Sequence, residues 1–138
     1  VPLGRPEILV EGSEITLVSY GSCLREVLRA DELIKSYGIS AEIIDVQTLM
    51  PFDLEGIILA SLKKTNRIVF IDEDVPGGAT AFMLNEVINV QGGYRYLDAQ
   101  PLCLTAKPHR TPFGSDGDYF TKPFAEDVVD IVLDAIKA

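Results

Sequence analysis

Apolar runs of two different periods alternate along this chain, and this alternation limits its possible folds more than any other feature. Residues 15–19 are a short apolar run rich in β-branched side chains, which is typical of a parallel strand covered on both faces. Residues 22–37 change to three- and four-residue spacing, and Gly38 follows where a helix C-cap is expected. The inward residues of this predicted helix are Leu24, Val27, Leu28 and Ile34. The sequence therefore predicts a strand that leads directly into an amphipathic helix.

The same unit recurs along the rest of the chain. Asp53 predicts the N-cap of a helix over 54–64 whose buried face begins at Leu54 and continues with Ile57, Ile58 and Leu62. The other expected elements are strands at 41–46, 67–72, 96–99 and 102–105, a helix at 79–89, and a last helix with Val128, Val132, Ala135 and Ile136 on one stripe. Strands that alternate with helices imply a parallel sheet with right-handed crossovers. We therefore expect one three-layer α/β/α domain with a mainly parallel five-stranded sheet.

Composition limits the function of this domain. The 138 residues carry a formal net charge of −9, which repels a phosphate backbone and argues against nucleic-acid binding. A basic protein is the better electrostatic partner. No apolar stretch approaches the roughly 20 residues of a membrane helix, so we expect a soluble chain without membrane contact. Cys23 and Cys103 are far apart and suggest neither a disulfide framework nor a metal site, which fits a reducing compartment.

The first residues differ from the rest of the chain. The segment Val-Pro-Leu-Gly-Arg-Pro precedes any periodic pattern and is typical of a linker or of an extension at a sheet edge. We expect residues 1–7 to be a linker from an upstream domain and residues 8–138 to be the folded domain. The chain begins without Met, signal peptide or transit peptide, and we interpret it as part of a longer protein.

Three local features suggest chemistry, and each also has a structural interpretation that we favour. The turn at Gly21 and Ser22 lies where phosphate-binding turns occur, but no G-x-G-x-x-G pattern is present, so Ser22 is expected to cap the helix. Cys23 at the helix start suggests a nucleophile, but a cysteine in an apolar run more often packs in a core. The acidic run 71–78 suggests a cation site or acid–base work, and a solvated turn is the favoured alternative. We therefore predict no catalytic, cofactor-binding or metal-binding residue.

The segment 107–123 is the least core-like part of the chain. It contains the only histidine, His109, beside Arg110, and Phe113 follows. Its Asp-Gly-Asp sequence lacks the spacing of a calcium loop. Long irregular segments in compact domains usually have a function. We interpret His109, Arg110 and Phe113 as part of a loop that packs against a partner chain, with substrate contact as the second interpretation.

Taken together, the segments of residues 1–101 resemble the C-terminal domain of transketolase-like enzymes. The resemblance is greatest to the β subunit of the thiamin diphosphate-dependent decarboxylase component of 2-oxo acid dehydrogenase complexes, of the branched-chain type. The sequences that carry it are Val1-Pro-Leu-Gly, Glu11-Gly-Ser-Glu-Ile-Thr-Leu-Val-Ser-Tyr-Gly-Ser22, Gly38-Ile-Ser-Ala-Glu-Ile-Ile-Asp-Val-Gln-Thr-Leu49, Pro51-Phe-Asp53, Lys64-Thr-Asn-Arg-Ile-Val69, Glu73, Gly77-Gly78, Leu97-Asp-Ala-Gln-Pro101 and Thr111-Pro-Phe113. Residues 114–122 depart from the family pattern, as an insertion would.

The resemblance implies a division of labour within a parent enzyme. Thiamin diphosphate and Mg²⁺ would be bound by upstream pyrimidine- and pyrophosphate-binding domains, and this chain would hold no cofactor. The C-terminal domain would assemble a homo- or hetero-oligomer and would dock the basic subunit-binding domain of a lipoyl acyltransferase. The docking carboxylate of the family corresponds to Asp98 here. A desolvated carboxylate that faces Arg or Lys suits this role.

The resemblance also sets the expected function and its alternatives. We expect a domain of an oxidoreductase that decarboxylates a 2-oxo acid and transfers the acyl group to a lipoyl arm. The domain alone would be inactive, and it would be found in the bacterial cytoplasm or, in a eukaryote, the mitochondrial matrix. The alternatives are the C-terminal domain of transketolase or deoxyxylulose phosphate synthase, and a free-standing α/β domain that binds a small anion.

Overall fold

The sheet of this domain has one antiparallel and four parallel strands. The computed structural model describes residues 4–73, 78–105 and 124–137. Its five strands lie in the order β1-β3-β2-β4-β5. The parallel strands are β2 (Ile15–Ser19), β3 (Ala41–Asp45), β4 (Ile68–Ile71) and β5 (Leu102–Leu104), and β1 (Glu7–Val10) pairs antiparallel with β3 at one edge. The expected mainly parallel, five-stranded sheet is confirmed.

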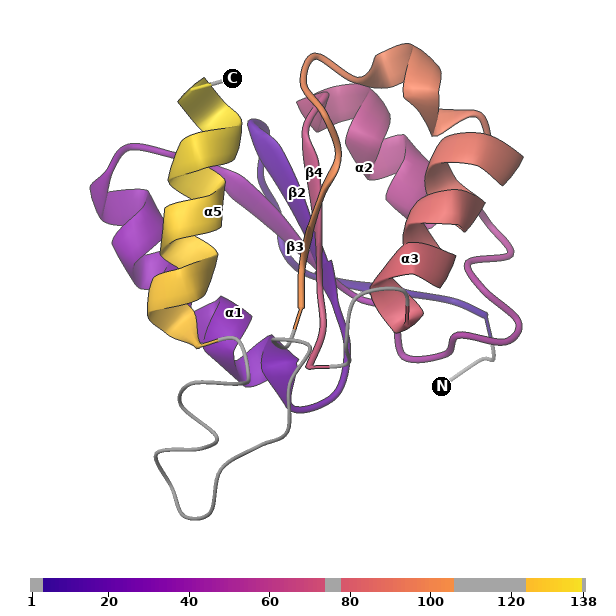
Figure 1. Cartoon of the computed structure of the whole chain (residues 1–138), viewed down its shortest axis with the longest axis horizontal. Helices are drawn as coiled ribbons and strands as arrows, with labels where there is room; N and C mark the ends of the chain where they lie inside the picture. Colours follow the sequence, from indigo (N-terminus) through magenta and orange to yellow (C-terminus); the bar gives the residue numbers. More distant parts are fainter. Residues whose placement is uncertain (1–3, 74–77, 106–123, 138) are drawn as a thin grey trace.

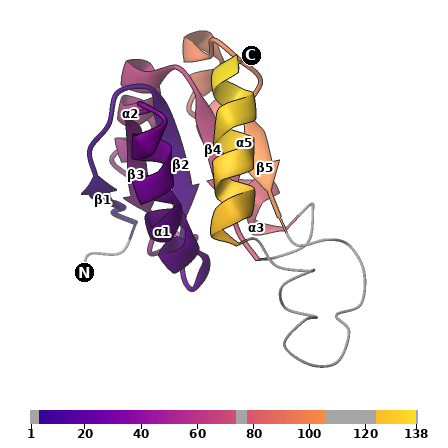
Figure 2. The same cartoon turned by 90° about the vertical axis from the view of Figure 1, so that its left-hand side faces the viewer.

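Helices cover both faces of the sheet. On one face, α1 (Cys23–Ser36) and α5 (Ala125–Lys137) lie side by side (Figures 1 and 2). On the other face lie α2 (Ile57–Thr65) and α3 (Ala79–Leu84), with the π-helical turns of η1 (Asn85–Val90) continuing α3 and the 3-10 turn η2 (Gly93–Tyr96) following. The three-layer α/β/α architecture is therefore as expected from the alternating periods.

Strand β2 shows how the two cores divide. All five of its residues are buried, because helices cover both of its faces. Ile15 and Leu17 belong to the core beneath α1 and α5, and Val18 belongs to the core beneath α2 and α3. Thr16 points to the same side as Val18, where its hydroxyl bonds to hydroxyls of α2. The two-residue period of a strand produces this division.

Two predicted inward residues are exposed instead. Helix α2 begins at Ile57 rather than Leu54, and Leu54 is 70% exposed. The reason is that Asp53 adopts a φ of +34° and its carboxylate accepts from the N–H groups of Ile57 and Ile58, at 2.8 Å each. Gly56 therefore takes the N-cap position predicted for Asp53, although the Asp53 carboxylate still accepts from the first N–H groups of the helix. Leu28 is also exposed, because α1 turns that side away from both the sheet and α5.

The predicted strand at 96–99 is absent from the structure. Residues 96–99 contain the end of a 3-10 turn and a bend, and the antiparallel β1 completes the sheet. The backbone of this segment bonds to Asn66 rather than to a strand: Asn66 Nδ2 donates to the Tyr96 carbonyl at 2.7 Å, and the Asp98 N–H donates to the Asn66 carbonyl at 2.8 Å. These local partners replace the ladder that a strand would need.

Candidate functional site

The carboxyl edge of the sheet has the topology at which α/β proteins place ligands. From β2, one crossover leads to β3 on one side, and the next leads to β4 on the other side. The ends of β2 and β4 therefore flank a topological switch point. There the Ser19 hydroxyl donates to the Ile71 carbonyl at 2.8 Å. We call the adjoining residues Tyr20, Ser22, Asp72 and Glu73 the junction.

Hydrogen bonds within the chain occupy the polar groups of the junction. The Tyr20 hydroxyl donates to Asp72 at 3.0 Å, and the Ser22 hydroxyl donates to Glu73 at 3.0 Å. Gly21 has a φ of +65°, so it provides the tight turn as expected. Ser22 makes no side-chain cap to α1, so that prediction is wrong: its hydroxyl is turned toward the carboxylate of Glu73 instead. The junction is thus a contact between two strand ends.

Two further predictions about this edge have clear outcomes. Asp72 is only 3% exposed, so the interpretation of the acidic run as a solvated turn is wrong for this residue; it lies at the end of a buried strand. Residues 74–77 of that run are outside the described residues. Cys23 is buried against the core beneath α1 and α5, as expected of a packing residue. Cys103 lies on β5, where partial burial raises the pKa of its thiol and a hydrogen bond to Thr80 offsets part of that effect.

Asp98 lies at the opposite, amino edge of the sheet, between η2 and the start of β5. We call Asn66, Gly93, Tyr96 and Asp98 the platform. Asn66 ends α2 with a φ of +62°, and its backbone and side chain together hold the segment that contains Tyr96 and Asp98. The Asp98 side chain is exposed, and within the described part of the chain it forms no ion pair. A fixed backbone therefore presents a solvated carboxylate.

Close packing holds the platform against the helices beneath it. Gly93 lies so near α2 and η1 that a Cβ there would come within 2.7 Å of the Val87 carbonyl oxygen and 3.0 Å of a Leu62 methyl group. On the outer side, the ammonium group of Lys63 lies 5.3 Å from the centroid of the Tyr96 ring. The position of Asp98 is therefore fixed by α2 and η1 rather than by its own side chain.

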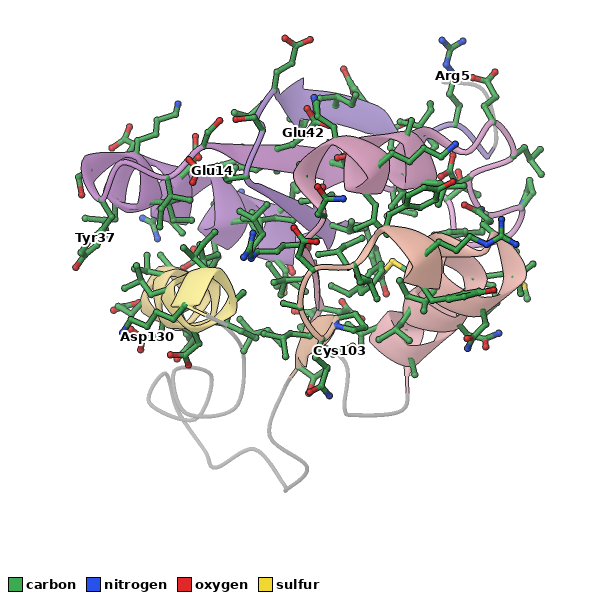
Figure 3. All side chains as sticks on the ribbon, turned by 90° about the horizontal axis from the view of Figure 1, so that it is seen from above. Arg5, Glu14, Tyr37, Glu42, Cys103 and Asp130 are labelled. Carbon is green, nitrogen blue, oxygen red and sulfur yellow. The ribbon has the colours of Figure 1, made fainter. Side chains whose placement is uncertain are left out.

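A buried carboxylate that the sequence analysis missed lies between β3 and α2. Glu42 on β3 is 1% exposed and accepts from Lys64 Nζ and from the Gly12 N–H, the latter at 3.1 Å. Burial acts to raise the pKa of Glu42, but hydrogen bonds from Lys64, Ser61 and Gly12 outweigh it, so this pKa lies below its usual range. Figure 3 shows Glu42 beside α2. A charged residue inside the apolar run 41–46 was the available signal.

The predicted interface loop lies outside the described residues, and only the residues that flank it can be compared with Asp98. His109, Arg110 and Phe113 are outside the described residues. The described residues that flank their segment are Thr105, which follows β5 at the carboxyl edge, and Phe124, which precedes α5. Asp98 precedes β5 at the amino edge.

In the three ranges that the structure covers, no group of His, Cys, Asp or Glu is arranged to hold a metal ion, and no helix is long and apolar enough to cross a membrane.

Sequence comparison places this fold in a family. The family model "Transketolase, C-terminal domain" matches residues 4–129. The chain belongs to this family. The domain is 32% identical over 138 residues to the "Pyruvate dehydrogenase E1 component subunit beta" of Acholeplasma laidlawii, covering 100% of this chain and 41% of that protein. It is also 32% identical over 136 residues to the "Acetoin:2,6-dichlorophenolindophenol oxidoreductase subunit beta" of Bacillus subtilis (strain 168), covering 99% of this chain and 39% of that protein.

A solved structure agrees with this transketolase C-terminal fold. The "Split gene transketolase, inactive beta4 tetramer" superposes with a TM-score of 0.78 at 24% identity, covering 99% of this chain and 43% of that chain. At this identity the match shows the fold alone. The transketolase C-terminal domain thus spans less than half the length of each of these relatives.

Proposed function

We propose that this chain is the C-terminal domain of the thiamin diphosphate-dependent decarboxylase component of a 2-oxo acid dehydrogenase complex. The proposal is supported by the family and by the similarity to β subunits of pyruvate dehydrogenase over the whole chain. In the parent enzyme, a 2-oxo acid of the branched-chain or a related type is decarboxylated and its acyl group passes to a lipoyl acyltransferase. The parent acts in the bacterial cytoplasm or in the mitochondrial matrix.

Among the described residues, those at the start of α1 do not fit thiamin diphosphate. A diphosphate needs N–H donors or cations, and its Mg²⁺ needs oxygen ligands. At the start of α1, however, the Ser22 hydroxyl is bonded to the Glu73 carboxylate, whereas Glu26 in the first helical turn is paired with Arg29. The negative charge of Glu73 at this position disfavours a bound diphosphate and the alternative of a small-anion site. We propose that upstream pyrimidine- and pyrophosphate-binding domains hold the cofactor, with residues 1–7 as the link, and we derive no chemical step in this chain.

The role left for the domain is assembly of the enzyme and docking of the acyltransferase. The observation that carries the docking proposal is the exposed carboxylate of Asp98 on a backbone that Asn66 holds in place. A preorganised carboxylate loses little conformational entropy when it pairs with an Arg or Lys. The formal net charge of −9 favours a basic partner in the same way. We propose that Asp98 binds the basic subunit-binding domain of the acyltransferase.

Calorimetric titration of the chain with such a subunit-binding domain tests the docking proposal. We expect binding that weakens as salt rises, and we expect Asp98→Asn to weaken it by about 2 kcal/mol, roughly thirtyfold in Kd. The control is Asp130→Asn, because Asp130 is an exposed carboxylate on α5, away from the platform (Figure 3). Equal affinity of the native chain and Asp98→Asn would exclude Asp98 from the interface.

A second measurement tests the division of labour. With thiamin diphosphate, Mg²⁺ and a 2-oxo acid, the isolated chain is expected to release no carbon dioxide, because the groups that bind the cofactor lie elsewhere. The parent enzyme under the same conditions is the positive control. Reproducible turnover by the 138-residue chain alone would overturn the proposal.

A further inference from the structure

The connection from β3 to α2 is held in one conformation. Gln47 and Asp53 have φ values of +64° and +34°, which side chains rarely adopt unless other contacts impose them. Those contacts are present: the Gln47 N–H donates to Asp45 at 3.0 Å, and the buried Asp53 carboxylate accepts two backbone N–H groups of α2. The backbone of residues 47–55 is therefore ordered by the domain itself.

This ordered connection presents apolar side chains to solvent. Met50 is 79% exposed and Leu54 is 70% exposed, the highest values for large hydrophobic residues in the described ranges. Phe52 between them is buried in the core beneath α2 and α3, so the connection is anchored from below. Single exposed hydrophobic residues are common, but here two of them stand on one ordered connection, which holds both in place before any partner binds. We call Met50 and Leu54 the Met50–Leu54 surface.

The leading segment of the chain lies along the same connection. The Leu54 N–H donates to the Gly4 carbonyl at 2.9 Å, Arg5 lies 3.5 Å from Glu55, and Gln47 Nε2 donates to Glu7 at 3.0 Å. At Gly4, with a φ of +76°, a Cβ would meet Leu54 at 2.9 Å. Figure 3 shows Arg5 at this end of the molecule. The chain therefore enters the domain in direct contact with Leu54.

We propose that the Met50–Leu54 surface is the contact surface for the domain that precedes this one in the parent polypeptide. The inference deepens the proposed function, because it requires such a parent. The matched family is a C-terminal domain and this chain covers 41% of a relative, so the remaining part of that relative precedes the match. The contacts of Gly4, Arg5 and Glu7 fix the path of the chain beside Leu54, so the upstream domain would be positioned next to Met50 and Leu54. Association through an attached segment needs little intrinsic affinity.

The test uses the parent polypeptide with the double substitution Met50→Glu and Leu54→Glu. The matched control is Leu33→Glu with Tyr37→Glu, which also charges two exposed apolar residues, one on α1 and one at its C-cap. We expect the native parent and the control to unfold in one calorimetric transition, because the attached segment and the interface together couple the two domains. In the test variant we expect two transitions and about tenfold faster proteolysis of the residues just before Gly4.

Two further measurements separate the possible causes. In the 138-residue chain alone, the double substitution is expected to leave the Tm within about 2 °C, since both residues are exposed there. A single transition and unchanged proteolysis in the variant parent would overturn the inference. So would a dimer of the isolated chain that the substitution dissociates, because the occupant would then be a second copy. Decarboxylation of a 2-oxo acid by the native parent tests the proposed function separately, since it requires no variant.

Discussion

The junction and the platform lie at opposite edges of one sheet and differ in what surrounds their carboxylates. At the junction, Asp72 and Glu73 accept hydrogen bonds from hydroxyls of the same chain. At the platform, the backbone around Asp98 is bonded, whereas its side chain is exposed. The carboxyl edge is where α/β proteins commonly bind ligands, whereas our docking proposal concerns Asp98 at the amino edge. A position in the fold indicates a binding site only when its polar groups are unoccupied.

The two regions are expected to differ most in the stability that is lost when a glycine is replaced by alanine. Gly93→Ala places a Cβ 2.7 Å from the Val87 carbonyl oxygen, and backbone cannot move aside as a flexible side chain can. We expect a loss of about 3 kcal/mol in the free energy of unfolding. Gly21→Ala meets nothing within 4 Å and costs only the strain of its positive φ, about 1 kcal/mol. Denaturant unfolding measures both, and equal losses would mean that the platform is not packed more tightly than the junction.

A smaller, pH-dependent loss in the free energy of unfolding is expected from a substitution of Glu42 at the amino edge. Glu42→Gln removes the charge that pairs with Lys64, and we expect a loss of about 2 kcal/mol near pH 7. Because the folded state lowers the pKa of Glu42, the native residue stabilises above the unfolded pKa of about 4.3, and this stabilisation disappears as pH falls through the folded pKa. The difference between native and variant should therefore shrink below about pH 4.

The control for this experiment is Glu32→Gln, which changes an exposed carboxylate on α1. Chemical denaturation at several pH values between about 3 and 7 compares the three chains. A constant difference between native and Glu42→Gln over this range would show that the charge of Glu42 does not contribute to folding.

The smallest effects are expected at the junction. Tyr20→Phe removes a hydroxyl that donates to the buried carboxylate of Asp72, and we expect a loss of about 1 kcal/mol. Ser22→Ala removes an exposed hydrogen bond and should change stability by less than about 0.5 kcal/mol. Thermal unfolding of the two variants measures both losses. A larger loss for Ser22→Ala than for Tyr20→Phe would reverse the assignment of Asp72 as the more deeply buried partner.

Much of the fold followed from the period of the apolar residues. The strands at 15–19 and 41–45 and the helix at 23–36 lie within about one residue of their predicted positions, because each is long enough to show its period clearly. The edge strand β1 was missed, since its short apolar run follows two prolines and a glycine that are typical of a linker. Residues 96–99 were assigned as a strand because apolar content alone does not show that their partner is Asn66.

The candidate sites also include some that the sequence indicated and some that it did not. The sequence indicated Asp98 through its resemblance to a family, and its role in docking stays a prediction. For Glu42 the only signal was a charged residue inside an apolar run, and the contact of Leu54 with Gly4 had none, because each depends on a residue distant in sequence. An Asn after the lysines of α2 is a known helix C-cap signal and could have predicted the conformation of Asn66.

By itself, the sequence determined the alternating elements, the parallel sheet and the acidic surface, because period, turn residues and charge are properties of short segments. Only the tertiary structure decided which polar groups are satisfied and which are exposed. Tyr20 and Asp72 meet because β2 and β4 end side by side, and the Asp98 segment is fixed because α2 ends beneath it. Hydrogen bonding and burial are relations between distant parts of the chain, so they arise only when the fold brings those parts together.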